Sequence, residues 1–329
     1  MIGKIKATWN ATLAEGRARA DRYLGARPHR SFRPTPKYKY KKGRQVAGMW
    51  PLVKGSFQLI WKERTILIGL MLLSALALFV FVGGIPTLSF ADLRRSINEI
   101  FTGDFGQIGA AWTLFNSAVT GSLNSATSPL QQFLAGLISV IFWLTYIWAL
   151  RHLLADKPQP IKIRDALYNS GSPLVSSAMV FLAAVVQLIP AALGSFGMAL
   201  VLSGQWLNGA EAMAFCAAAA LLCLLSIYWV VSSLIALVVV TVPGMYPWRA
   251  LAGSSVLVIG QRWAIALRVV LLVVLLYVIW AVVLIPMLLL DNWLKFDYLP
   301  IITFTVQLLG AFTIMYASVY MYKLYRSML

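Results

Sequence analysis

The sequence predicts an all-α, polytopic integral membrane protein with six transmembrane helices, arranged as three hairpins with interfacial amphipathic helices. Composition is the first reason. Of the 329 residues, 60% are hydrophobic and 12% charged, whereas soluble domains hold about half apolar and a quarter charged residues. The mean hydropathy of +0.77 agrees with this. The uneven placement of the charges along the chain is the second reason. Together these features exclude a soluble enzyme, a fibrous chain and a disordered chain.

Six apolar stretches reach the roughly 20 residues that a spanning helix needs. None of them alternates polar and apolar residues, which disfavours a β-barrel. Pro190 is expected to interrupt the third stretch, and the length of the fourth predicts a tilted helix or one that extends beyond the bilayer. The predicted spans are Thr65–Gly84, Gln131–Leu153, Leu174–Leu202, Ala210–Val242, Ala264–Leu290 and Leu299–Lys323.

The distribution of basic residues predicts the orientation of these spans. Six spans place both termini on one side of the membrane. Every Lys and Arg falls on that side except Arg94, Arg95 and Lys295, while the acidic residues divide almost evenly. Because short cytoplasmic loops carry the excess of Lys and Arg, we expect both termini in the cytoplasm. The expected location is a bacterial inner membrane, which the chain crosses several times.

Residues 1–48 predict a basic cytoplasmic N-terminal arm, and residues 49–329 predict the six-span membrane domain. Residues 1–24 lack the continuous apolar core of a cleavable signal peptide. Their apolar residues recur at helical spacing among Lys and Arg, a pattern typical of an amphipathic helix on the inner leaflet. Residues 25–44 contain three prolines and no acids, so we expect a disordered tether there.

The tether ends in a basic run interleaved with two tyrosines. The run consists of Lys37, Lys39, Lys41, Lys42 and Arg44. Three roles stay open for it: a topological signal only, contact with anionic lipid headgroups at about 1 kcal/mol per basic residue, or contact with nucleic acid through phosphates and stacked rings. The topological signal alone ranks first, contact with a lipid headgroup or another polyanion is the hypothesis for a ligand, and nucleic acid ranks last.

Three segments on the cytoplasmic side resemble one another, and each precedes an odd-numbered span. They begin at Met49, Ile163 and Met245. Residues 165–170 align without gaps on residues 249–254. In the first segment one helical face is expected to hold Trp50, Val53, Phe57, Ile60 and Trp61. The simplest organisation is three hairpins of consecutive spans, each preceded by an interfacial helix.

The third segment carries a resemblance to a known family. It reads Pro247-Trp248-Arg249-Ala250-Leu251-Ala252-Gly253-Ser254-Ser255, followed by Gln261-Arg262-Trp263. A Pro–x–x–Ala-Leu–x–x–Ser element before Gln-Arg-Trp and a spanning helix resembles the six-helix membrane domain attached to some glycerophosphodiester phosphodiesterases. It is similar also to related bacterial inner-membrane proteins. The resemblance covers residues 49–329 and implies a fold; it implies no catalytic residues, and the soluble phosphodiesterase domain is not expected here.

Residues 85–130 are the only sizeable segment expected on the external side. Their apolar residues recur at helical spacing and predict two amphipathic helices. These helices either cap the bundle or form a surface for a substrate or partner.

Ionisable residues are missing from the interiors of the predicted spans, where they would be the usual sign of a transport or catalytic site. The three that come closest lie near span ends: His152, Glu211 and Arg268. The best candidates for polar contacts inside the bundle are Gln187, with the kink expected at Pro190, and Gln307. Hydrogen bonding between helices is the ordinary role of such residues, and contact with a ligand is the alternative.

Catalytic and cofactor motifs are not found in the sequence. It contains two His and two Cys, which precludes His-rich metal sites, and it has no phosphate-binding glycine loop or nucleophile elbow. We therefore predict no enzyme, and no catalytic, metal-binding or cofactor-binding residue.

The sequence thus predicts a non-enzymatic inner-membrane protein that binds or organises lipid, above all anionic lipid, or partner membrane proteins. The alternative is a small transporter or channel for an apolar or lipid-like substrate, bound near Gln187, Pro190 and Gln307. A polar cavity running through the bundle would favour the transporter.

Overall fold

The computed structural model describes residues 46–83, 129–155, 161–202, 209–242, 244–294 and 301–329, which belong to one unit, Gln45–Leu329. Most of the predicted arm 1–48 and of the predicted external loop 85–130 therefore lies outside the described residues. The basic run is also outside them, with Lys37, Lys39, Lys41, Lys42 and Arg44.

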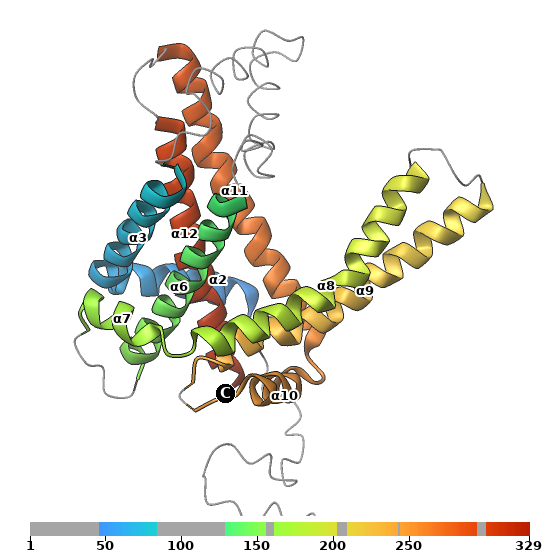
Figure 1. Cartoon of the computed structure of the whole chain (residues 1–329), viewed down its shortest axis with the longest axis horizontal. Helices are drawn as coiled ribbons and strands as arrows, with labels where there is room; N and C mark the ends of the chain where they lie inside the picture. Colours follow the sequence, from blue (N-terminus) through green and yellow to red (C-terminus); the bar gives the residue numbers. More distant parts are fainter. Residues whose placement is uncertain (1–45, 84–128, 156–160, 203–208, 243, 295–300) are drawn as a thin grey trace, which may run out of the picture. The chain divides into compact units, whose positions relative to one another are not determined.

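Every regular element in these ranges is helical (Figure 1). The long helices are formed by long apolar runs. The short helices begin where polar and apolar residues are mixed in the sequence. In chain order the elements are α2 (Met49–Lys62), α3 (Arg64–Leu78), a π-helical turn η1 (Phe79–Gly83), α6 (Pro129–Leu153), α7 (Ile163–Ser170), α8 (Leu174–Leu202), α9 (Ala210–Val239), α10 (Pro247–Val258), α11 (Arg262–Leu294) and α12 (Ile301–Met328).

Six helices in the described ranges are long and apolar enough to span a membrane. They are Arg64–Val82, Leu130–Leu153, Leu174–Met198, Ala210–Val239, Arg262–Leu290 and Phe304–Met328. The predicted all-α, multi-pass membrane protein is confirmed. The sixth span lies farther along the chain than the predicted Leu299–Lys323, because α12 begins at Ile301 and continues past Lys323 to Met328.

The predicted interruption at Pro190 is wrong. Proline lacks an N–H group and usually kinks or breaks a helix, yet α8 runs without a break from Leu174 to Leu202. Beside the proline, the hydroxyl group of Ser226 on the neighbouring helix α9 bonds the backbone of α8.

α12 is the central helix of the bundle. It packs against α2, α3, α6, α9 and α11. One face of it is fully buried over four turns, with Ala311, Met315, Tyr316, Val319, Tyr320 and Leu324 at most 1% exposed. Positions three and four apart share one helix face, so this spacing makes α12 the core around which the other helices pack.

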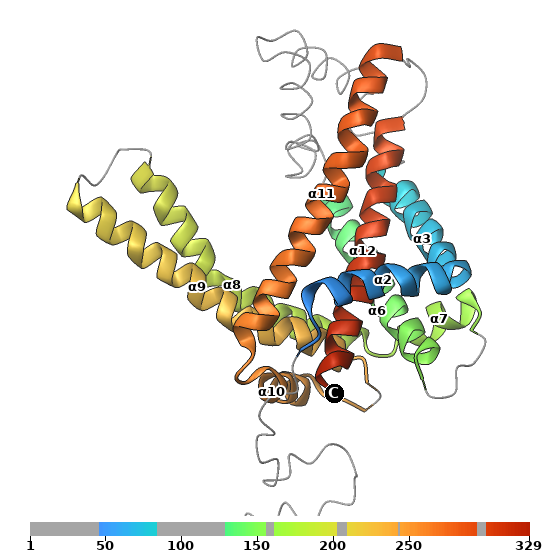
Figure 2. The same cartoon turned by 180° about the vertical axis from the view of Figure 1, so that it is seen from behind.

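α8 and α9 form a hairpin that packs mainly on itself. In Figures 1 and 2 its far end diverges from α11 and α12. Buried or half-buried positions recur at heptad spacing on both helices, as along a coiled-coil seam. They are Val180, Gln187 and Gly194 on α8, and Ala219, Ser226 and Ser233 on α9.

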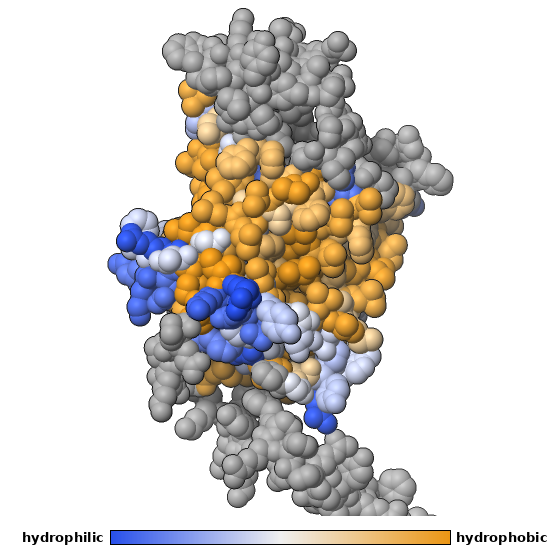
Figure 3. Space-filling model, turned by 60° about the vertical axis from the view of Figure 1, so that its left-hand side comes forward, coloured by the Kyte–Doolittle hydropathy of each residue, from blue (hydrophilic) through white to orange (hydrophobic). Residues whose placement is uncertain are grey.

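The element order has the predicted threefold pattern, in which a short helix precedes each hairpin. α2 precedes α3 and α6, α7 precedes α8 and α9, and α10 precedes α11 and α12. All three short helices lie towards the end of the bundle that holds the chain's C-terminus (Figures 1 and 2). On the face shown in Figure 3, apolar side chains form a broad band and hydrophilic ones gather towards one end.

The face predicted for α2 is divided in the structure. Val53 and Ile60 are buried against the bundle, whereas Trp50, Phe57 and Trp61 are exposed. The apolar arc of this helix is therefore wider than its contact with the bundle: Trp50 and Trp61 face outward, and Phe57 is partly exposed at the margin of the contact.

Candidate functional site

The polar groups predicted inside the membrane join α8 to α9. The hydroxyl group of Ser226 accepts a hydrogen bond from the Ala191 N–H (3.0 Å) and donates one to the Gln187 carbonyl (2.8 Å). Ser233 donates to Gln187 Oε1 at 2.7 Å. Ser226 thus inserts into the backbone ladder of α8 beside Pro190, where the regular bonding of the helix is weakened.

Close packing of small residues surrounds this polar contact. A Cβ atom on Gly194 would lie 2.8 Å from the Ala219 carbonyl oxygen and 3.4 Å from Cys223 Sγ. The thiol of Cys223 also approaches the Ala191 carbonyl at 3.8 Å. Small residues let two membrane helices approach until their backbones touch. The site predicted at Gln187 and Pro190 is therefore filled by α9.

Gln307, the third predicted intramembrane residue, lies elsewhere. It is half-buried on α12, which packs against α2, α3, α6, α9 and α11. Near it along the helix, the hydroxyl group of Thr313 accepts a hydrogen bond from Trp280 Nε1 of α11 at 2.8 Å. The contacts of Gln187 are made to α9, so the structure does not bring Gln187 and Gln307 together in one polar contact.

Exposed aromatic side chains gather on the short helices. Trp50, Trp61, Tyr168 and Trp248 are 72–87% exposed. They are carried by α2, α7 and α10, the helices that lie towards one end of the bundle (Figure 1). Trp and Tyr concentrate at the headgroup level of membranes because their rings are apolar with a polar group.

Three aromatic rings, of which only Trp61 belongs to this exposed group, have an Arg guanidinium over them. Arg64 lies 5.9 Å from the ring centroid of Trp61, Arg249 lies 5.7 Å from that of Tyr246, and Arg262 lies 4.2 Å from that of Tyr228. We call the set Trp50, Trp61, Arg64, Tyr228, Tyr246, Trp248, Arg249, Arg262 and Trp263 the aromatic–arginine edge. Stacking of this kind holds a guanidinium in place while its N–H groups stay free to bind an anion.

Two further arginines are held by backbone carbonyl groups. Arg268 is 9% exposed and donates to the Val46 carbonyl at 3.0 Å, the Ala47 carbonyl at 2.8 Å and the Ala264 carbonyl. Arg151 donates to the Thr241 carbonyl at 2.6 Å. Arg268 thereby attaches the chain just before α2 to α11. The sequence predicted only that Arg268 lies near the end of a span. The one sign of its role was a charged residue inside an apolar run.

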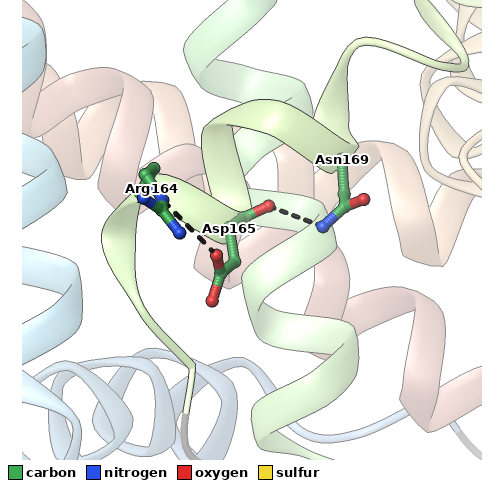
Figure 4. Close-up of polar contacts among 3 residues, drawn as sticks. All are labelled: Arg164, Asp165 and Asn169. Atoms are coloured by element: carbon green, nitrogen blue, oxygen red, sulfur yellow. Dashed lines mark hydrogen bonds and ion pairs between the residues drawn. The ribbon is translucent and has the colours of Figure 1, made fainter.

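The exposed ion pair on α7 has no catalytic geometry. Arg164 Nε lies 3.9 Å from Asp165 Oδ1, and Asn169 Nδ2 donates to the Asp165 carbonyl at 2.8 Å (Figure 4). The two charged side chains are 91% and 46% exposed. In the part of the chain that the structure describes, no three His, Cys, Asp or Glu residues are grouped so that they could hold a metal ion.

The aligned segments of α7 and α10 have equivalent environments. Ala166 and Ala250 are both 0% exposed. Ser170 donates to the Leu167 carbonyl and Ser254 to the Leu251 carbonyl, each at 2.9 Å. The two helices therefore use matching residues to pack on the bundle, and they differ in their outward residues.

Comparison with protein-family models, with curated proteins and with solved structures found no match to this chain.

Proposed function

We propose that this chain is a non-enzymatic membrane protein that binds and organises anionic phospholipid, or recruits partner membrane proteins, through the aromatic–arginine edge. In a bacterial inner membrane the positive-inside rule would place this edge in the cytoplasmic leaflet, with both termini in the cytoplasm. The observation that carries the proposal is the stacking of Arg64, Arg249 and Arg262 on aromatic rings of the edge.

The chemistry of the edge suits a phospholipid headgroup. An Arg side chain can donate two parallel hydrogen bonds to a phosphate group. The exposed rings of Trp50, Trp61 and Trp248 offer the amphipathic contact that aromatic residues make between headgroups and acyl chains. Each basic residue near an anionic leaflet contributes about 1 kcal/mol. By the same topology, the basic run that ends at Arg44 would add charge in that leaflet.

The alternative function, a small transporter or channel, is less well supported. It requires Gln187, Pro190 and Gln307 to surround one substrate. The contacts of Gln187 with Ser226 and Ser233 account for that residue as a link between helices. The suspected resemblance to the six-helix membrane domain of glycerophosphodiester phosphodiesterases is compatible with either function.

The test is the lipid content of the protein purified in nanodiscs cut directly from its membrane. We expect anionic phospholipid to be enriched over the bulk membrane. The triple variant Arg64→Gln, Arg249→Gln, Arg262→Gln should lose this enrichment, because each charge contributes roughly fivefold to occupancy.

The matched control replaces the same three arginines by Lys. It keeps the three positive charges, so it should retain most of the enrichment. Wild-type protein with bulk lipid composition and no co-purifying membrane protein would overturn the proposal. Equal enrichment in the Gln variant would remove the aromatic–arginine edge as its cause.

A further inference from the structure

The crossing of α2 over α12 holds a lysine for which the bundle offers no acidic partner. Lys323 is half-buried on α12, and its ammonium group lies against α2 at Gly55, where an added Cβ atom would overlap Nζ. Phe57 of α2 also contacts Tyr316 of α12, with ring centroids 4.9 Å apart and the ring planes tilted by 45°. Two contacts close together on α2 thus join it to α12.

The charge of Lys323 is not neutralised by the described part of the chain, in which it forms no ion pair or hydrogen bond. Burying an ammonium group away from water costs free energy unless an anion or a hydrogen-bond acceptor compensates it. Two exposed basic residues are close in sequence: Lys54 precedes Gly55 on α2, and Arg326 lies one turn beyond Lys323 on α12. Lys54 and Arg326 thus stand one and three residues from the two groups in contact, and among the described residues no carboxylate pairs with Lys323.

The surface beside this cluster is apolar and aromatic. Trp50, Phe57 and Trp61 on the outward part of α2 are exposed. A ligand that fits here carries a phosphate group for the cations and a hydrocarbon chain for the rings. Inorganic phosphate or a soluble nucleotide satisfies only the first requirement.

We propose that Lys323, with Lys54 and Arg326, binds the headgroup phosphate of one anionic phospholipid at the α2–α12 crossing, and that the glycine at position 55 provides the room. This inference rests on the proposed function, of which it names one specific site. The lipid held there differs from the lipid attracted by the aromatic–arginine edge because it contacts a half-buried ammonium group.

The test uses the full chain in detergent, with native mass spectrometry of bound phosphatidylglycerol during stepwise delipidation. Wild-type protein should retain one phosphatidylglycerol after the others are removed. Lys323→Gln should lower its occupancy at least fivefold, and Gly55→Ala should do the same by displacing the ammonium group. Millimolar inorganic phosphate should not displace the lipid.

Two variants control for folding and for charge. Lys323→Arg keeps the cation and should keep the lipid, so a loss in Lys323→Gln cannot be ascribed to a disturbed helix. Lys162→Gln removes an exposed lysine before α7 and should change the occupancy less than twofold. Unchanged retention in both Lys323→Gln and Gly55→Ala would overturn the site, as would displacement by inorganic phosphate.

The two proposals can fail separately. If wild-type protein enriches anionic lipid in nanodiscs but retains none selectively during delipidation, the α2–α12 site is wrong and the aromatic–arginine edge stands. If it enriches no anionic lipid and no membrane protein co-purifies with it, the proposed function is wrong.

Discussion

One hydroxyl group supports α8 beside Pro190. Ser226 bonds both the Ala191 N–H and the Gln187 carbonyl, and it is 0% exposed. A serine on one helix thus takes the place of a regular bond in another. In the membrane interior no water is present to form hydrogen bonds with these backbone groups. The contact between the helices therefore depends on the Ser226 side chain.

Ser226→Ala should destabilise the protein by about 1–2 kcal/mol, because it removes the two hydrogen bonds by which α9 contacts the backbone of α8. The measurement is reversible unfolding in mixed detergent. Ser232→Ala is the matched control: the Ser232 hydroxyl bonds only the Trp229 carbonyl of its own helix, and its loss should cost less than about 0.5 kcal/mol. Equal losses in the two variants would contradict the role given to Ser226.

Arg268 holds α2 in place through carbonyl groups of Val46 and Ala47. Its backbone carbonyl also accepts a hydrogen bond from Tyr320 Oη of α12 at 3.0 Å. The positive charge of Arg268, near the membrane surface, is stabilised by the three carbonyl groups that surround it. This role of an Arg inside a span does not require a substrate.

Arg268→Met should release the segment before α2. We expect a loss of about 2–3 kcal/mol, since hydrogen bonds to charged groups are the stronger kind. Hydrogen exchange of the amides at 48–54 should rise at least tenfold, while those of α6 stay unchanged. Unaltered exchange at the start of α2 would show that Arg268 does not anchor it.

At the scale of the elements, the helices are held together by two different kinds of packing. Large buried aromatic residues pack α12 against its neighbours, with Tyr146, Tyr316 and Tyr320 fully buried. The α8–α9 hairpin relies on small residues at heptad spacing, so its backbones lie close together and leave its other faces exposed. The two kinds of packing differ in which positions tolerate a larger side chain.

Two Gly→Ala substitutions test the packing of small residues in the α8–α9 hairpin. Gly194→Ala places a methyl group 2.8 Å from the backbone oxygen of Ala219, whereas Gly136→Ala on α6 meets nothing within 4 Å. The first should destabilise the protein by about 1–3 kcal/mol, because backbone atoms cannot give way easily. The second should be neutral or stabilise it by up to about 1 kcal/mol. Unfolding midpoints in detergent distinguish them, and a neutral Gly194→Ala would refute the close approach.

At the scale of the whole molecule, the alternation of six spans puts the ends of the helices on two sides. The start of α8 and the end of α9 share a side with α7 and α10, while Gly209 and the start of α9 lie on the other. The described basic side chains lie on or beside α2, α7 and α10, at the starts of α3 and α11, and at the ends of α6 and α12.

Labelling with an impermeant maleimide tests this arrangement in cells. In a background of Cys216→Ala and Cys223→Ala, Tyr168→Cys and Trp248→Cys should react only after the membrane is opened. Glu211→Cys should react in intact cells, because it lies at the start of α9, which the predicted orientation places on the external side. Reaction of all three in intact cells would contradict the expected orientation.

The sequence alone determines those features of the structure that depend on residues close together in the chain. Long apolar runs are sufficient for six helices, since a span is decided by about 20 consecutive residues. The alignment of 165–170 with 249–254 predicted two short helices whose Ala and Ser residues pack alike. The polar character of Gln187 was visible as well, although its partners were not.

Contacts between distant residues were decided only by the tertiary structure. The hydroxyl group that bonds the backbone beside Pro190 belongs to Ser226, 36 residues away. That Gln187 and Gln307 do not form one site follows from which helices are neighbours. The ammonium group of Lys323 meets Gly55 because α2 crosses α12. Such contacts join side chains that no local pattern relates, because packing between helices selects them from the many pairs that apolar sequences of similar composition allow.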